Sequence, residues 1–342
     1  MSGWRKVPSH TYEESTMQAT RLKEVLGKLL EQEWAVFLWG APGIGKSSIV
    51  HQVAEERNLP VVDLRATLLD PTDLRGIPML KDGTAVWCPP AFLPKEGDTP
   101  GILFLDELNA APPLVQAGMY QLVLDHAVGE YRLPEGWRII AAGNRAADRA
   151  VTFRLSSALA NRFVHLELEQ DIGSWTLWAQ THGIESSILG FLNYRPSLLL
   201  TQAESGPYAS PRTWEMLSDT IKAFGSITAV TDIASGIVGE GPANEFLTFA
   251  RDAVTREEIE ALKKDPQGAP LPTRMDRLWS LVGYLSVRDN AVSHVALIVA
   301  LLSRLPIEFS IILLKNALTA NPRLFTNPEV IEFMRSHANL FK

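Results

Sequence analysis

The sequence predicts an α/β fold with a parallel sheet flanked by helices, followed by a region made of helices alone. A glycine-rich loop at residues 40–47 lies between a short apolar run and a helical pattern. Short apolar runs then alternate with helical patterns as far as residue 169, and beyond it apolar residues recur at helical spacing almost throughout. Alternating strands and helices favour a parallel sheet, and the change of pattern predicts a domain boundary near residue 170.

Composition agrees with a folded protein of about two domains. The chain has 342 residues, of which 46% are hydrophobic and 21% are charged, so a sizeable core is expected. The net charge is −7 and no block of Lys and Arg occurs, which disfavours a dedicated nucleic-acid binder. The single cysteine, Cys88, excludes an intramolecular disulfide framework and suits a reducing compartment, so we expect a cytoplasmic protein.

We expect neither a secretory signal nor a membrane span. Residues 1–15 contain charged residues without an apolar core, and we interpret them as a loose leader. The longest apolar stretch, residues 295–314, is interrupted by Arg304, Pro306 and Glu308. That stretch predicts two buried helices with a turn between them rather than a membrane helix.

The first elements follow from hydrophobic spacing. Residues 16–31 predict an amphipathic helix, because apolar residues recur there at helical spacing. Residues 35–39 predict a buried strand, residues 48–56 a helix and residues 59–64 a second strand. A strand, a helix and a strand at this spacing predict a parallel pair with a right-handed crossover.

The loop at residues 40–47 fits the pattern G-x-x-x-x-G-K-[ST] and has the strand–loop–helix context of a phosphate-binding loop. Gly43 and Gly45 allow the backbone to point successive N–H groups at phosphates, and the following helix adds its positive end. We expect Lys46 to reach the β- and γ-phosphates and Ser47 Oγ to bind Mg²⁺. The predicted nucleotide-binding residues are Gly40, Pro42, Gly43, Ile44, Gly45, Lys46, Ser47 and Ser48.

Two hairpins are predicted as insertions in this pattern. Near residues 74–91, two short strands flank Asp82 and Gly83, a pair that favours a tight hairpin turn. A helix is expected to resume near Pro90, so this hairpin would be an exposed projection from a helix. A second hairpin is expected within residues 126–138, with its turn near residues 134–136.

The remaining elements place polar residues at strand ends. We expect strands at residues 101–105, 138–144 and 164–168, and helices at residues 113–124 and 155–163. Asp106 and Glu107 follow the first of these strands, where carboxylates face the ligand crevice of a parallel sheet. Asp106 is expected to hold Mg²⁺ through water, and Glu107 to activate the attacking water. Asn144 could bind that water or the γ-phosphate, although asparagine is also common in turns.

Three arginines are candidates for contact with a γ-phosphate. Arg162 is a candidate finger supplied to a neighbouring subunit, because a planar guanidinium suits the charge that builds up in phosphoryl transfer. Arg154 is a nearby competitor for that role. Arg212 opens a predicted helix beyond the boundary, where Pro211 suits the first turn. The seven histidines are scattered without metal-ligand spacing, which argues against a zinc site.

Together these motifs resemble an AAA+ ATPase of the MoxR type, in the helix-2-insert clade. The resemblance covers residues 20–215 and rests on motifs at residues 40–47, 103–113, 141–145, 158–163 and 210–212. It implies an ATP- and Mg²⁺-binding core at residues 16–169 and a helical lid with a C-terminal extension at residues 170–342. It marks Lys46, Ser47, Asp106 and Glu107 as Walker residues, Asn144 as sensor 1, Arg162 as arginine finger and Arg212 as sensor 2.

The resemblance also implies a function. MoxR-type proteins are similar to chaperones that form rings, commonly hexamers, and remodel or activate a protein partner, often one with a von Willebrand factor A domain. Two alternatives stay open: a nucleic-acid motor, and a scaffold that binds nucleotide but barely turns it over. Hairpins without a strong basic surplus disfavour the motor. Glu107, Asn144 and Arg162 together disfavour the scaffold, which does not need all three.

Overall fold

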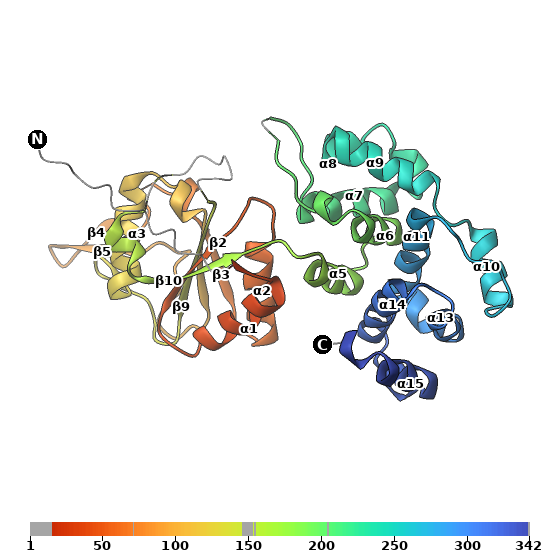
Figure 1. Cartoon of the computed structure of the whole chain (residues 1–342). Helices are drawn as coiled ribbons and strands as arrows, with labels where there is room; N and C mark the ends of the chain where they lie inside the picture. Colours follow the sequence, from red (N-terminus) through yellow and green to blue (C-terminus); the bar gives the residue numbers. More distant parts are fainter. Residues whose placement is uncertain (1–15, 71, 146–152, 154, 204, 341–342) are drawn as a thin grey trace, which may run out of the picture. The chain divides into compact units, whose positions relative to one another are not determined.

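A computed structural model of the chain describes residues 16–70, 72–145, 153, 155–203 and 205–340. The predicted leader at residues 1–15 lies outside these described residues. The chain divides into two compact units, Met1–Glu169 (unit 1) and Gln170–Lys342 (unit 2), each of which is considered by itself (Figure 1).

Unit 1 is built on a parallel sheet whose strands follow the predicted apolar runs. The strands of this sheet are β1 (Thr16–Met17), β2 (Ala35–Trp39), β3 (Val61–Arg65), β6 (Ile102–Asp106), β9 (Arg138–Gly143) and β10 (Phe163–Leu168). Within the described part of the chain the order is β1-β10-β2-β9-β6-β3, and all neighbours run parallel. In this order β3 lies on one side of β2 and β10 lies on the other side, so the direction in which strands are added reverses at β2. Ligands of open parallel sheets bind at the carboxyl ends of the strands beside such a reversal.

Helices cover both faces of this sheet (Figure 1). The helical elements of unit 1 are α1 (Ala19–Leu29), α2 (Lys46–Glu56), α3 (Pro113–Asp125) and α4 (Ser157–Ala160), with 3-10 turns η1 (Ala66–Leu68) and η2 (Leu108–Ala110). On one face, Leu26 of α1 and Val50 of α2 share a buried cluster with Leu38 of β2. On the other face, Met119 of α3 shares a second cluster with Phe37. Alternate residues of β2 therefore face opposite layers, as a pleated strand requires.

The first hairpin of unit 1 forms as predicted. β4 (Ile77–Lys81) pairs antiparallel with β5 (Thr84–Cys88), and Figure 1 shows the pair extending from the rest of the unit. Asp82 and Gly83 have φ angles of 53° and 79°, the two positive values that a type I′ turn requires.

The second hairpin has its turn at a different place from the prediction. β7 (Ala127–Val128) pairs with β8 (Tyr131–Arg132), so the turn lies at Gly129 and Glu130. Gly129 has a φ of 57°, which glycine adopts without the steric cost of a side chain. The predicted turn at residues 134–136 is a separate turn, in which Trp137 N–H donates to Pro134 O at 3.3 Å.

Three helix predictions need correction. No helix resumes near Pro90, because the stretch 89–100 contains four prolines, which lack a backbone donor, and forms turns instead. The helix expected at residues 16–31 is shorter, since Thr16–Met17 pairs with β10 as a strand. The helix expected at residues 155–163 is confined to α4, capped by Ser156, because Phe163 already belongs to β10.

Unit 2 contains helices and no strand in its described residues, 170–203 and 205–340. Its α-helices are α5 (Ile172–Thr181), α6 (Ser186–Tyr194), α7 (Pro211–Phe224), α8 (Ala234–Val238), α9 (Glu240–Arg251), α10 (Arg256–Lys264), α11 (Met275–Ser286), α12 (Arg288–Ser293), α13 (Val295–Leu302), α14 (Ile307–Ala320) and α15 (Pro328–Ser336). Its 3-10 turns are η4 (Pro196–Leu198), η5 (Thr228–Val230), η6 (Pro322–Thr326) and η7 (Ala338–Leu340). Buried residues form two clusters, one centred on Phe191, Trp214 and Phe246 and the other on residues of α11, α13 and α14.

The longest apolar stretch forms two helices with a turn between them, as predicted. α13 and α14 are separated by residues 303–306, and Ser310 Oγ donates to Leu302 O at 3.0 Å across that turn. In the portion of the chain that the structure describes, no helix has the length and apolar character needed to cross a bilayer.

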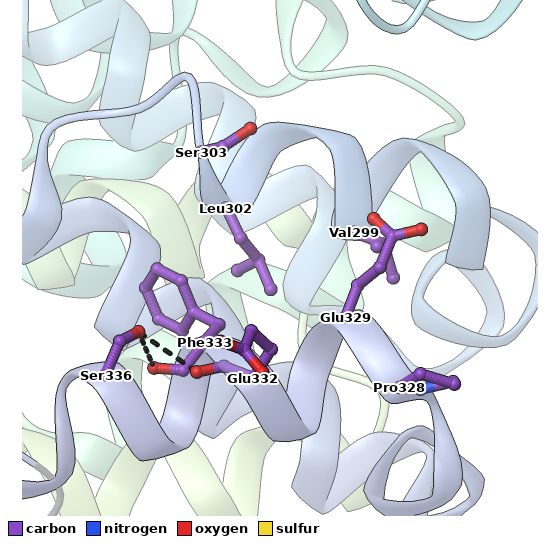
Figure 2. Close-up of a pocket in the computed structure, with 8 residues that line it drawn as sticks. All are labelled: Val299, Leu302, Ser303, Pro328, Glu329, Glu332, Phe333 and Ser336. Atoms are coloured by element: carbon purple, nitrogen blue, oxygen red, sulfur yellow. Dashed lines mark hydrogen bonds between the residues drawn. The ribbon is translucent and has the colours of Figure 1, made fainter.

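An open groove of about 420 Å³ lies in unit 2 between α13 and α15 (Figure 2). Its apolar surface comes from Val299, Leu302 and Phe333, and two carboxylates, Glu329 and Glu332, also line it. Because its lining residues include no cationic side chain, this groove is not suited to hold phosphates.

Candidate functional site

The glycine-rich loop joins β2 to α2 in the geometry of a phosphate-binding loop. Gly43 and Gly45 have φ angles of 76° and 110°, in a region that residues other than glycine rarely adopt. Gly45 is the N-cap of α2, so the positive end of an 11-residue helix faces the loop. Of the remaining predicted binding residues, Pro42 and Ile44 are half-buried and Ser48 is exposed.

Lys46 is held in the centre of this loop. Its side chain is 8% exposed, and Nζ donates to Gly40 O at 2.7 Å and to Ala41 O at 3.1 Å. The same Nζ donates to Asn144 Oδ1 at 2.8 Å. The structure thus brings two predicted site residues, Lys46 and Asn144, into direct contact.

The predicted Mg²⁺ residues are also in contact. Ser47 Oγ donates to Asp106 Oδ2 at 3.0 Å, across from α2 to the end of β6. The other oxygen of that carboxylate, Oδ1, accepts the backbone N–H of Glu107 at 2.9 Å, which fixes its orientation.

Glu107 has a backbone conformation that marks it as a special position. Its φ is 56°, in the left-handed region, which is uncommon for a residue with a side chain and clusters at functional sites. Its Oε2 accepts a hydrogen bond from Thr67 Oγ1 of η1 at 2.9 Å. Sequence reasoning missed Thr67, although a polar residue shortly after a buried strand was a usable signal.

A further carboxylate, Asp63 of β3, lies near Asp106. Burial, and then the nearby negative charge of Asp106, raise the pKa of the Asp63 carboxyl. His51 of α2 offsets part of this effect, with Nε2 at 3.7 Å from Asp63 Oδ2. This part of the site therefore carries negative potential, which favours a bound cation.

The residues present suit Mg²⁺ bound together with a nucleotide. Among the described residues, no group of three or more His, Cys, Asp and Glu side chains is arranged to hold a metal ion. Mg²⁺ does not need such a cage, because it keeps several waters and binds phosphate oxygens with one or two protein oxygens. Ser47 and Asp106, already in contact beside the loop, match that requirement.

Of the three candidate arginines, the structure describes two, and these have different surroundings. Arg162 follows α4, its Nη1 donates to Ala158 O at 2.6 Å, and its guanidinium lies 4.9 Å from the ring centre of Tyr120. Its buried Nε has no hydrogen-bond partner among the described residues. Arg212 is exposed in the first turn of α7 in unit 2, and Arg154 lies outside the described residues. The roles of these arginines stay predictions.

Comparison with known proteins finds a family match for the part of the chain that carries this site. Residues 35–163, less than half of the chain, match the family profile of the AAA domain (dynein-related subfamily). A comparison with curated proteins finds no match.

Several solved structures match this chain at low sequence identity. NtrX from Brucella abortus in complex with ADP shares 16% identity over 94% of this chain and 68% of that chain, with a TM-score of 0.40. An ATPase described as putative from Cytophaga hutchinsonii shares 16% identity over 76% of this chain and 92% of that one, with a TM-score of 0.38. A RuvB variant from Thermotoga maritima shares 17% identity over 80% and 84%, with a TM-score of 0.40. Residues 35–163 thus match the AAA domain profile, and the six-stranded parallel sheet has the topology of an AAA+ P-loop NTPase fold.

Proposed function

We propose that the chain binds ATP with Mg²⁺ at the phosphate-binding loop and hydrolyses it. The observation that carries this proposal is the set of contacts among Lys46, Ser47, Asp106 and Asn144 at the carboxyl ends of β2, β6 and β9. Lys46 and the loop N–H groups would bind the phosphates, and Ser47 with Asp106 would hold the metal ion. Bound Mg²⁺ would neutralise charge that develops on the phosphate oxygens. Glu107 would take the proton of the attacking water.

Nucleotide binding is tested by Lys46→Ala. The variant loses the one ammonium that the loop surrounds, so we expect the Kd for ATP to rise by about 10–100-fold. Binding of a fluorescent ATP analogue in excess Mg²⁺ measures it. Lys28→Ala is the matched control, because Lys28 is 70% exposed on α1 and only forms a surface pair with Glu24. Equal Kd values for the wild type and Lys46→Ala would contradict the proposal.

We further propose that the protein acts as a MoxR-type remodeller in a ring, for which a hexamer is the expected form. The five motifs support this assignment, and unit 1 and unit 2 would serve as nucleotide-binding core and helical lid with a C-terminal extension. Arg162 would reach a neighbour's nucleotide, and Arg212 would contact a γ-phosphate from the lid. The partner would be a protein, with a von Willebrand factor A domain as the expected kind, and the site of action cytoplasmic.

The β4–β5 hairpin supports a protein partner over a nucleic acid. Ile77, Met79 and Leu80 are 72%, 56% and 82% exposed, which gives this projection an apolar surface. The nearby Arg75 is exposed, and its guanidinium lies over the Trp87 ring at 5.2 Å. Apolar projections bind protein chains, whereas nucleic-acid motors need cationic ones.

The hairpin is tested by the double variant Met79→Ser, Leu80→Ser. We expect basal ATP hydrolysis within about twofold of the wild type, because both side chains are exposed and away from the loop. Stimulation of hydrolysis by casein, an unfolded test chain, should be lost in this variant and kept in Leu114→Ser, which changes an equally exposed residue of α3. Stimulation by single-stranded DNA rather than by casein would favour the motor alternative and contradict the proposal.

A further inference from the structure

Asn109 is a buried residue to which the proposed function gives no role. It lies in η2, directly after β6, and is 3% exposed. Its Nδ2 donates to Asn144 O at 2.7 Å, and its Oδ1 accepts Asn144 N–H at 3.1 Å. One side chain therefore satisfies both backbone groups of the residue that follows β9.

This double contact needs a short carboxamide. Asparagine offers a donor and an acceptor in one plane, whereas aspartate offers acceptors alone and serine a single hydroxyl. The approach is close, because a Cβ on Gly143 would lie 2.3 Å from Asn109 Oδ1. A residue larger than glycine at position 143 would displace the amide, so Gly143 and Asn109 form a matched pair.

The contact continues to the phosphate-binding loop. With its backbone fixed by Asn109, Asn144 presents Oδ1 to Lys46 Nζ at 2.8 Å. Lys46 Nζ in turn donates to Gly40 O. A continuous series of hydrogen bonds thus connects the end of β6, which carries Asp106, with the end of β9 and the loop.

Asn109 also contacts the chain that leads to α4. Its backbone oxygen accepts Phe153 N–H at 2.6 Å. Phe153 precedes α4, and Arg162 follows that helix. The residue that fixes Asn144 therefore also anchors the segment before the proposed arginine finger.

We propose that Asn109 is a positioning residue, which sets Asn144 against Lys46 and so places the γ-phosphate for hydrolysis. This inference rests on the proposed function, since it assigns Asn144 a role at the γ-phosphate. Asn109 is 3% exposed, so it would not itself contact a bound nucleotide. It acts through the backbone of Asn144, so its loss disturbs catalysis more than binding.

The kinetic test uses Asn109→Ala, Asn144→Ala and the double variant. Asn109→Ala should lower kcat for ATP hydrolysis about 30-fold and change the Kd of a fluorescent ATP analogue less than about threefold, because positioning affects the reacting geometry alone. When Asn144 is already alanine, adding Asn109→Ala should lower kcat by less than about threefold further. The two substitutions remove the same interaction, so their effects on kcat should not be additive. If the fold-reductions in kcat of the two single variants multiplied in the double variant, the proposal would be overturned.

Two further variants separate positioning from folding. Asn109→Asp keeps the size of the side chain but faces Asn144 O with a carboxylate, so its kcat should fall as far as that of the alanine variant. Wild-type kcat in Asn109→Asp would overturn the proposal. Gln116→Ala is the matched control. Gln116 is also buried, and the variant likewise removes a side-chain hydrogen bond to a backbone oxygen, the one from Nε2 to Ala111 O. We expect Gln116→Ala to lower the Tm but to keep kcat within about twofold.

Hydrogen exchange provides a readout that does not depend on hydrolysis. In nucleotide-free protein, the amide of Asn144 should exchange at least about tenfold faster in Asn109→Ala than in Gln116→Ala, because its acceptor is gone. Unchanged exchange would overturn the positioning role. A wild-type protein without ATPase activity would instead contradict the proposed function, and the two failures are thereby distinguished.

Discussion

Glu107→Gln is expected to keep ATP bound while lowering kcat for hydrolysis by about 10²–10³-fold. Glutamine has nearly the same size as glutamate. Its amide oxygen can still accept the hydrogen bond that Thr67 Oγ1 donates to Glu107 Oε2 at 2.9 Å. The amide cannot take a proton from water, so the variant loses the general base alone. Steady-state phosphate release, together with the Kd of a fluorescent ATP analogue, measures both quantities.

Glu55→Gln is the control for this change. Glu55 is exposed on α2, the helix that begins at the phosphate-binding loop, so the variant makes the same chemical change away from the reacting groups. Its kcat should stay within about twofold of the wild type. If Glu107→Gln retained wild-type turnover, another group would have to activate the water, and the role assigned to Glu107 would be wrong.

Arg162→Ala is expected to lower kcat by about 10³-fold in the assembled protein while leaving ATP binding intact, because an arginine finger stabilises charge in the transition state. In the isolated structure, Arg162 contacts Ala158 O and the Tyr120 ring of its own unit. On assembly the guanidinium would exchange these contacts for a neighbour's phosphate. Arg21→Ala, which removes a 59% exposed arginine paired with Glu24, is the control.

Mixing the two inactive variants tests whether Arg162 acts across subunits. Glu107→Gln subunits keep Arg162, and Arg162→Ala subunits keep Glu107. An intact shared site needs Glu107 from one subunit and Arg162 from its neighbour. In a ring assembled at random from equal amounts of the two variants, about one interface in four has both residues, so the mixture should regain about a quarter of the wild-type rate. A mixture as inactive as its components would show that each subunit needs both residues itself.

The sheet was predictable because its strands are short apolar runs bounded by polar or turn residues. β2 follows the predicted bounds without change, and β6 (Ile102–Asp106) begins and ends one residue after the predicted bounds 101–105. Buried strands of a parallel sheet leave this mark in the sequence whatever they pack against. The first hairpin was predictable for a similar local reason, since Asp82 and Gly83 suit only a few turn types.

The errors arose where two local signals competed. Both Gly129 and the stretch 134–136 can form turns, and the pairing of Val128 with Tyr131 decides between them. The prediction of a helix near Pro90 did not take into account the prolines that follow it, which disfavour a helix there. At the site, the phosphate loop and the carboxylates were predictable from motif spacing, but the contacts of Thr67 and Asn109 were not. Their partners, Glu107 and Asn144, lie 40 and 35 residues away, and only the folded sheet brings them together.

The most direct test of the account is the ATPase rate per subunit, measured against protein concentration together with particle mass with and without ATP. The account predicts a rate that rises steeply over the concentration range in which the mass changes from one subunit to a ring. Arg162→Ala should assemble over the same range and show no rise. A concentration-independent rate from a particle of one subunit would contradict a shared site, and the arginine would then have no role across subunits.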